Sequence, residues 1–179
     1  MKVPTKQEQM EVSSEKKVIL LSSLIAVLFY ILDQITKEII VKSMRLYDSI
    51  PVLDGFFNIT SVRNRGAAWG IFEGKQWFLL LIALAAMLIV IFFFKKLTCG
   101  FKERIFALFF LCSGILGNCT DRLFRKEVVD FLDFYIGKHH WPAFNVADIC
   151  ICVGVGLFVL SSLLRPEPEE DKKGKAEEK

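Results

Sequence analysis

Residues 77–94, with the sequence WFLLLIALAAMLIVIFFF, contain no charged side chain and decide the class of fold. A helix rises about 1.5 Å per residue, so about 20 residues cross a hydrocarbon core of about 30 Å. This run is nearly long enough to cross alone. Three further runs without Asp, Glu, Lys or Arg occupy residues 18–32, 105–116 and 149–164. The chain is therefore predicted to be an all-α membrane protein with four transmembrane helices.

Composition agrees with this class. Of 179 residues, 53% are hydrophobic and 24% are charged, and the mean hydropathy is +0.42. The charged residues gather between and beyond the apolar runs, whereas a water-soluble domain would alternate apolar and polar positions. A dispersed net charge of +3 argues against nucleic-acid binding. We expect a transmembrane domain over residues 18–164 between disordered cytoplasmic tails at residues 1–17 and 165–179.

Basic residues predict the orientation of the spans. They cluster at both ends of the domain and in the connection between the second and third runs: Lys16, Lys17, Lys95, Lys96, Lys102, Arg104 and Arg165. Basic residues close to span ends favour the cytoplasmic side. Both termini are therefore predicted to be cytoplasmic, and the connections at about residues 41–76 and 121–147 to face outward.

The outward connections carry strand signals. Residues 50–52 and 56–62 are expected to form short strands around a turn at Asp54-Gly55. Residues 128–135 are another extended, apolar-rich stretch. Together they predict a small extracytoplasmic sheet, or cradle, on the membrane surface.

Five polar clusters interrupt the apolar pattern, and the predicted topology brings all of them to the outer face. They are residues 33–37, 64–70, 117–122, 128–131 and 144–148. An ionisable side chain at membrane depth costs about 2.5–3.5 kcal/mol and usually serves a function. Any one of these residues alone could instead contact lipid headgroups. The set as a whole indicates a functional site at this face.

Carboxyl groups are the chemistry that the clusters offer. The chain shows no Ser/His pair, Cys/His dyad or phosphate-binding glycine loop, and its five cysteines have neither CxxC spacing nor an even count. The neighbouring His139 and His140 do not make a metal site alone. Two carboxyl groups that share a proton can activate water, because the ionised one takes a proton while the protonated one polarises a carbonyl.

Six aspartates are candidates for such a pair: Asp33, Asp54, Asp121, Asp130, Asp133 and Asp148. Asp148 opens the fourth span and is expected to point into the bundle. Asp130 and Asp133 have opposite parity on an extended segment, so only one of them faces the same site.

Two aspartates are predicted to form ion pairs. Asp121 stands beside Arg122, which suggests a pair rather than an acid poised for catalysis. Asp33 and Lys37 are four residues apart on a helix and could pair in the same way.

The five clusters, in this order on four spans, resemble the lipoprotein signal peptidase (signal peptidase II) family of bacterial aspartic endopeptidases. The resemblance runs from about residue 18 to residue 164. It implies removal of signal peptides from prolipoproteins by cleavage on the amino side of a diacylglyceryl-modified cysteine. We expect diacylated prolipoproteins and membrane lipids as partners, a monomeric enzyme, and no cofactor or metal.

The resemblance also assigns site residues. The catalytic pair corresponds to Asp130, from Val-Val-Asp-Phe, and Asp148, from Phe-Asn-Val-Ala-Asp. The substrate-binding or supporting residues correspond to Asp33, Asn64, Gly66, Asn118, Asp121, Arg122 and Asn145. Gly66 is expected to allow close approach of the substrate backbone. The amides of Asn118 and Asn145 would fix the pair or bind the peptide, or would only satisfy helix termini.

Two other classes of function remain open from the residues. A small transporter that relays protons would need polar residues through the membrane depth and an internal repeat, and the sequence shows neither. A lipoprotein chaperone would keep the fold without the chemistry, which the intact Asp130 and Asp148 argue against.

Overall fold

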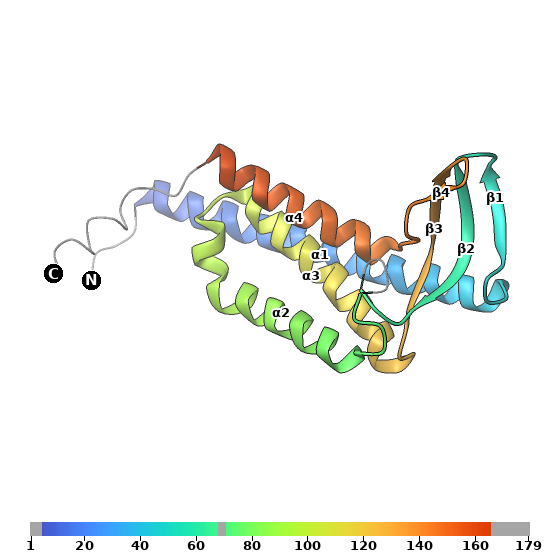
Figure 1. The fold of residues 1–179 in the computed structure, drawn as a ribbon. Coiled ribbons are helices and arrows are strands. Elements are labelled where there is room, and N and C mark those ends of the chain that lie inside the picture. The colour runs from blue at the N-terminus through green and yellow to red at the C-terminus, as the bar shows by residue number, and fades with distance from the viewer. Residues whose placement is uncertain (1–4, 68–70, 166–179) are drawn as a thin grey trace.

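Four long helices form the body of the molecule in a computed structural model that describes residues 5–67 and 71–165. The helices are α1 (Lys6–Ser43), α2 (Gln76–Thr98), α3 (Lys102–Phe124) and α4 (Val146–Leu164). Within the described residues, these four are long and apolar enough to cross a membrane. The predicted helices are therefore confirmed, and Figure 1 shows them running along one another.

The first helix begins earlier than predicted. Residues 6–17, expected to be disordered, are helical and continue directly into the first apolar run. The segment KQEQMEVSSEKK is rich in Lys, Gln and Glu, which have high helix propensity, and extending an existing helix needs no new nucleation. The prediction of disorder is wrong for these residues. Apart from Arg165, the predicted C-terminal tail lies outside the described residues.

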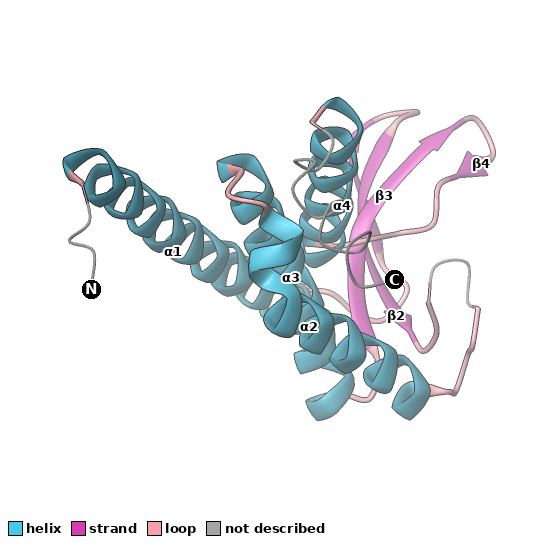
Figure 2. Cartoon of the chain, turned by 90° about the vertical axis from the view of Figure 1, so that its left-hand side faces the viewer, coloured by secondary structure: helices cyan, strands magenta, loops and turns pink. Residues whose placement is uncertain are grey.

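Helix α3 is the central helix and packs against the other three (Figure 2). Its contact with α4 is close because two glycines lie in it. A Cβ at Gly154 of α4 would stand 2.7 Å from the backbone nitrogen of Leu111, and one at Gly114 of α3 would overlap the carbonyl oxygen of Ala147. This close contact holds the start of α4 against the outer half of α3.

A four-stranded antiparallel sheet crosses one end of the bundle (Figure 1). Its strands, in order, are β1 (Ser49–Leu53), β2 (Phe57–Asn64), β3 (Val128–Ile136) and β4 (His139–His140). The strands predicted at 50–52, 56–62 and 128–135 are confirmed. The two residues of β4 are too few to give an alternating pattern, and the sequence did not predict them.

An apolar cluster fixes the sheet on the bundle. Ile40 and Met44, at the end of α1, pack against Val129 and Phe131 of β3. Since successive side chains of a strand point to opposite faces, burying Val129 and Phe131 against α1 turns Asp130 to the other face. The fold therefore directs Asp130 through the packing of its two neighbours.

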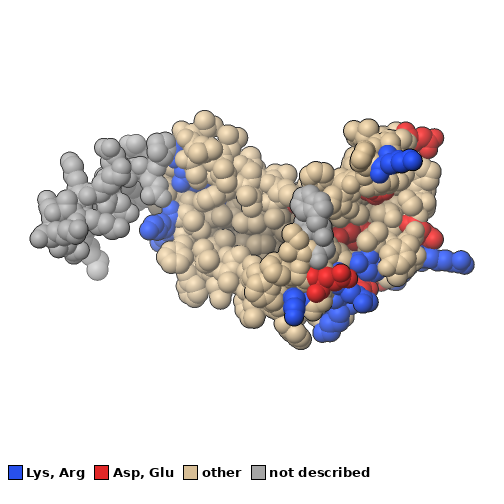
Figure 3. All heavy atoms as spheres, viewed as in Figure 1, with Lys and Arg blue, Asp and Glu red and all other residues tan. Residues whose placement is uncertain are grey.

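The surface of the bundle is apolar between charged ends. On the face drawn in Figure 3, Lys, Arg, Asp and Glu side chains gather at the sheet end, basic ones also at the opposite end, and neither kind covers the middle. On α2, Phe92 is 77% exposed and Leu81 is 65% exposed. An apolar surface of this extent fits lipid rather than water.

Candidate active site

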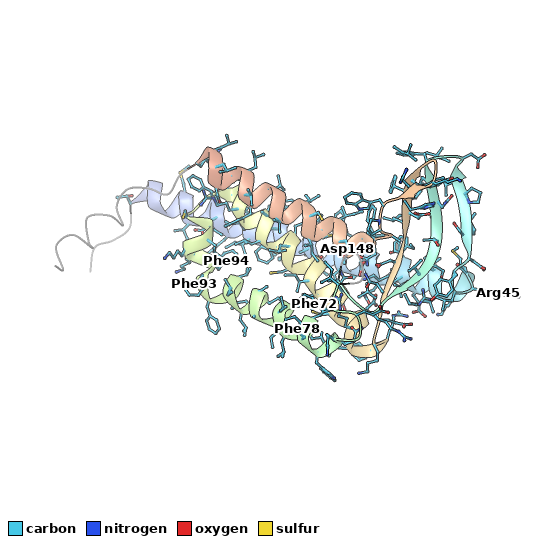
Figure 4. All side chains as sticks on the ribbon, viewed as in Figure 1. Arg45, Phe72, Phe78, Phe93, Phe94 and Asp148 are labelled. Atoms are coloured by element: carbon cyan, nitrogen blue, oxygen red, sulfur yellow. The ribbon has the colours of Figure 1, made fainter. Side chains whose placement is uncertain are left out.

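Asp148 stands in the first turn of α4, where it closes a capping box with Asn145. The Asn145 Oδ1 accepts from the Asp148 backbone N–H (3.0 Å), and the Asp148 Oδ2 accepts from the Asn145 backbone N–H (3.1 Å). Such reciprocal bonds satisfy donors that a helix start leaves unpaired. They also fix the Asp148 side chain, which Figure 4 shows where α4 meets the sheet.

Asp130 approaches the same place from β3. Its Oδ1 accepts from Asn145 Nδ2 (2.7 Å) and its Oδ2 accepts from Asn64 Nδ2 (3.1 Å). Val62 of β2 pairs with Asp130, so Asn64 lies two residues along on the same face and reaches Asp130 diagonally. The Asp130 residue is only 3% exposed.

Asn145 therefore touches both aspartates: its side-chain amide donates to Asp130 and its backbone N–H donates to Asp148. Asn118 of α3 completes the connection by donating from Nδ2 to Asp148 Oδ1 (2.8 Å) and accepting from Asn145 Nδ2 (3.2 Å). Asn145 thus both caps a helix and holds the pair. The hydrogen bonds of Asn118 to Lys37, Asp148 and Asn145 all join side chains, so its amide holds the site rather than a helix terminus.

The charge state of Asp130 is set by its surroundings. The pKa of Asp130 is raised to about 7, first by burial and then by the nearby Asp148 carboxylate, because like charges repel. Hydrogen bonds from Asn64 and Asn145 oppose this rise because they favour the ionised carboxylate. An acid with a pKa near neutral, beside a second carboxyl group, suits a pair that shares one proton.

Behind the pair lies a buried ionic cluster around Lys37. Its Nζ contacts Asp33 Oδ2 (2.9 Å) and Asp121 Oδ2 (3.1 Å), and it donates to Asn118 Oδ1 (3.0 Å). The predicted Asp33–Lys37 pair is confirmed. Asp33 and Asp121 thus support the site from behind and do not reach the groove that the aspartate pair lines.

The predicted pair of Asp121 with Arg122 is wrong. Asp121 pairs with Lys37 and with Arg125, whose Nε lies 3.2 Å from Asp121 Oδ1. Consecutive side chains of a helix point in different directions, whereas residues four apart share a face. Arg122 instead donates from Nη2 to the carbonyl oxygen of Gly66 (2.8 Å).

Gly66 is held from two sides beside the aspartate pair. Besides the bond from Arg122, its backbone N–H donates to Asn64 Oδ1 (2.8 Å). Asn64 thus orients both Gly66 and Asp130. Residues 68–70, which end the polar cluster predicted at residues 64–70, lie outside the described residues.

A groove of about 680 Å³ runs from the aspartate pair along α3 and α4. Its polar end contains Asn64, Asn118, Arg122, Asp130 and Asp148. Its apolar walls include Ala83, Ile115, Trp141, Phe144, Ile149 and Val153. A larger groove of about 810 Å³ between α1, α2 and α3 is lined almost entirely by apolar side chains and contains none of the predicted site residues. The polar groove is therefore the candidate active site.

Among the described residues, no group of three or more His, Cys, Asp or Glu side chains is arranged to hold a metal ion. His140 instead contacts the Asp133 carboxylate at 2.9 Å, and Asp133 accepts from Asn58 Nδ2. Asp133 therefore bonds to other residues of the sheet and does not line the groove that contains Asp130. This agrees with the prediction that only one of these two residues faces the site.

Comparison with known proteins agrees with this geometry. The family model of signal peptidase II, peptidase family A8, matches residues 25–164. A lipoprotein signal peptidase of Bacillus pumilus is 48% identical over 143 residues, which cover 79% of this chain and 91% of that protein. The chain belongs to the signal peptidase II family.

Solved structures show the same fold. A bacterial membrane enzyme at 2.3 Å resolution superimposes with a TM-score of 0.76 and 40% identity, covering 84% of this chain and 93% of its own. Another at 1.9 Å gives a TM-score of 0.73 and 42% identity, over 82% and 94% of the two chains. The chain is thus a multi-pass inner-membrane aspartic peptidase that removes signal peptides from prolipoproteins. The transporter and chaperone alternatives are not supported.

The sequence did not predict the central position of Lys37 among the site residues. The i,i+4 spacing to Asp33 indicated a simple pair, but Lys37 also contacts Asp121 and Asn118, which are distant in the chain. A lysine within a membrane-spanning helix is costly, and that cost was the available signal. The Asn145–Asp148 capping box was likewise readable from an Asn three residues before an Asp at the start of an apolar run.

Proposed function

We propose that Asp130 and Asp148 are the catalytic pair of this peptidase and hydrolyse the peptide bond on the amino side of a diacylglyceryl-modified cysteine. The observation that carries the proposal is the bonding of both aspartates to Asn145 at the polar end of one groove. One residue thus holds two carboxyl groups from separate elements around a common space.

The reaction needs the pair to hold a single proton. The raised pKa of Asp130 supports this state near neutral pH. The ionised carboxyl removes a proton from water, whose oxygen attacks the scissile carbonyl carbon, while the protonated carboxyl donates to the carbonyl oxygen. The tetrahedral gem-diol intermediate then breaks its C–N bond, and the leaving amine takes the proton that the first carboxyl had removed from water. As the carbonyl re-forms, a hydroxyl of the intermediate returns its proton to the second carboxylate, so the pair again holds a single proton.

The groove supports a substrate that is partly lipid. Its polar end would receive the peptide around the scissile bond, and its apolar walls between α3 and α4 would receive side chains of the signal peptide. The diacylglyceryl chains would remain among membrane lipids. Both aspartates come from one chain, so the site is complete in a monomer.

The proposed orientation puts the sheet and the aspartate pair at the outer face of the membrane, with both termini in the cytoplasm. The start of α1, the end of α2, the start of α3 and the end of α4 share the end of the bundle opposite the sheet (Figure 1). Lys95, Lys96 and Lys102 lie at that end. Basic residues near span ends favour the cytoplasmic side.

The test uses a diacylated precursor and its unlipidated twin with purified wild type, Asp130→Asn and Asp148→Asn. We expect wild type to cleave only the diacylated precursor, and both variants to cleave neither. Asn58→Ala, which removes an amide from the Asp133 side of the sheet, is the matched control and should remain active. Full turnover by either aspartate variant would remove that residue from the catalytic role.

A further inference from the structure

Lys37 is a fully enclosed charge behind the site: its side chain is 0% exposed. An ammonium group has three N–H donors and no acceptor. Its three partners are Asp33 Oδ2, Asp121 Oδ2 and Asn118 Oδ1, at 2.9, 3.1 and 3.0 Å. Every donor of Lys37 therefore has a partner. Lys37 does not line the groove that contains the aspartate pair.

The two carboxylates bound by Lys37 hold the backbone next to the catalytic pair. Asp33 Oδ1 accepts from the backbone N–H of Ala147 (2.8 Å), the residue before Asp148. Asp121 Oδ2 accepts from the backbone N–H of Val129 (3.1 Å), the residue before Asp130. Lys37 thus connects two carboxylates, each of which accepts a hydrogen bond from the backbone of the residue that precedes one catalytic aspartate.

Lys37 also determines the direction of the Asn118 amide. Because Lys37 only donates, the Asn118 oxygen faces it, and the Asn118 Nδ2 must then face Asp148 Oδ1. A reversed amide would set two donors against each other and turn an oxygen toward a carboxylate. The same Asn118 oxygen accepts from Asn145 Nδ2, which also donates to Asp130. Lys37 therefore determines which atoms of the Asn118 and Asn145 amides donate and which accept.

We propose that Lys37 is a positioning residue of the reaction: by joining Asp33 to Asp121 and orienting Asn118, it fixes the spacing and the hydrogen bonds of the Asp130–Asp148 pair. The proposal rests on the catalytic role proposed for that pair.

The charge of Lys37 adds a second effect on the pair. Asp130 faces Asp148 from α4, Arg122 from α3 and Lys37 from α1. The positive charge of Lys37 opposes the rise in the pKa of Asp130. Without it, Asp130 would keep its proton to higher pH. A residue that served only the folding of the bundle would not move the pH dependence of the reaction.

The test compares kcat, KM and the pH profile of Lys37→Met with those of Lys42→Met. Lys42 is a matched control because it also pairs with an acid four residues earlier on α1, but its side chain is 74% exposed. For Lys37→Met we expect kcat to fall on the order of 100-fold, as for other small displacements of reacting groups, with KM within about twofold of wild type. The alkaline limb of kcat should move to higher pH. Lys42→Met should match wild type in all three.

Lys37→Arg is the second variant and carries the test if the Met variant does not fold. It keeps a charge that only donates, so the alkaline limb should stay at the wild-type pH while kcat falls on the order of 10-fold because the guanidinium is larger. The kcat of each variant is calculated per folded enzyme, and the folded fraction is taken from the amplitude of its cooperative unfolding transition.

Two results would overturn the inference. One is a Lys37→Met enzyme with the kcat and alkaline limb of wild type. The other is a Lys37→Arg enzyme whose limb moves away from that of wild type. Asp130→Asn, assayed alongside, separates the two proposals: activity in that variant removes the catalytic pair itself, whereas its inactivity beside an unaffected Lys37→Met removes only the role of Lys37.

Discussion

Two buried cations, Lys37 of α1 and Arg104 of α3, lie near opposite ends of α3 and have different kinds of partner. Lys37, at the sheet end, contacts two carboxylates and an amide of the site. Arg104, at the other end, is 3% exposed and donates to the carbonyl oxygens of Ser161 and Arg165 and to the Ser161 hydroxyl. Those carbonyls belong to the end of α4, where the helix dipole is negative. Burial of a charge therefore does not by itself mark a functional residue; its partners do.

The largest expected effect lies at the sheet end. Asp148→Asn keeps the shape of the side chain but cannot take a proton from water, so kcat should fall on the order of 10⁴-fold. The amide has one acceptor oxygen where the carboxylate has two, so one of the bonds from Asn118 and from the Asn145 backbone N–H is lost. The Asn145 side chain still accepts from the backbone N–H of residue 148. Cleavage of a fluorogenic diacylated peptide measures the loss. Residual activity above about one-tenth of wild type would contradict the assignment.

The pH dependence of the free energy of unfolding should reflect the burial of Asp130 at the sheet end. The raised pKa of Asp130 means that the folded protein binds a proton more tightly than the unfolded chain. Its contribution is therefore favourable at low pH and is lost as pH rises from about 4 to 7, by about 4 kcal/mol at most. Asp130→Asn should flatten this part of the curve. Unfolding in detergent at several pH values measures it, and an unchanged slope would contradict the burial of the charge.

Arg104→Met tests the other half of the comparison. It leaves the carbonyl oxygens at the end of α4 without their partner, so we expect a loss of about 2 kcal/mol in the free energy of unfolding. The kcat of the enzyme that remains folded, and its alkaline limb, should match those of wild type because Arg104 is distant from the aspartate pair. A shifted limb would show that the two ends are not independent.

A smaller effect distinguishes two amide–carboxylate pairs that both join β2 to β3. Asn64 donates to Asp130, and Asn58 donates to Asp133. Asn64→Ala removes a bond that favours the ionised form of Asp130, so its pKa should rise and the alkaline limb should move to higher pH, with kcat down on the order of 10-fold. Asn58→Ala should leave the limb in place. Equal shifts in both variants would remove Asn64 from the site.

The sequence predicted what periodicity and short-range spacing can carry. Runs without charge predicted the helices, short extended stretches on either side of the Asp54-Gly55 turn predicted the first two strands, and parity separated Asp130 from Asp133. It did not predict contacts that depend on how distant segments pack. The pairing of Asp121 with Lys37 is one such contact, since it requires α1 and α3 to lie side by side. The helical state of residues 6–17 was missed because their polarity hid their helix propensity.

The direct test of the account is the titration of the Asp130 carboxyl group, followed by 13C NMR in detergent micelles with labelled aspartate. In wild type the midpoint should lie near pH 7. In Asp148→Asn it should move to lower pH, because the neighbouring negative charge is gone while burial remains. A wild-type midpoint near pH 4 would contradict a pair of carboxyl groups that shares one proton. So would a midpoint that is the same in wild type and in Asp148→Asn.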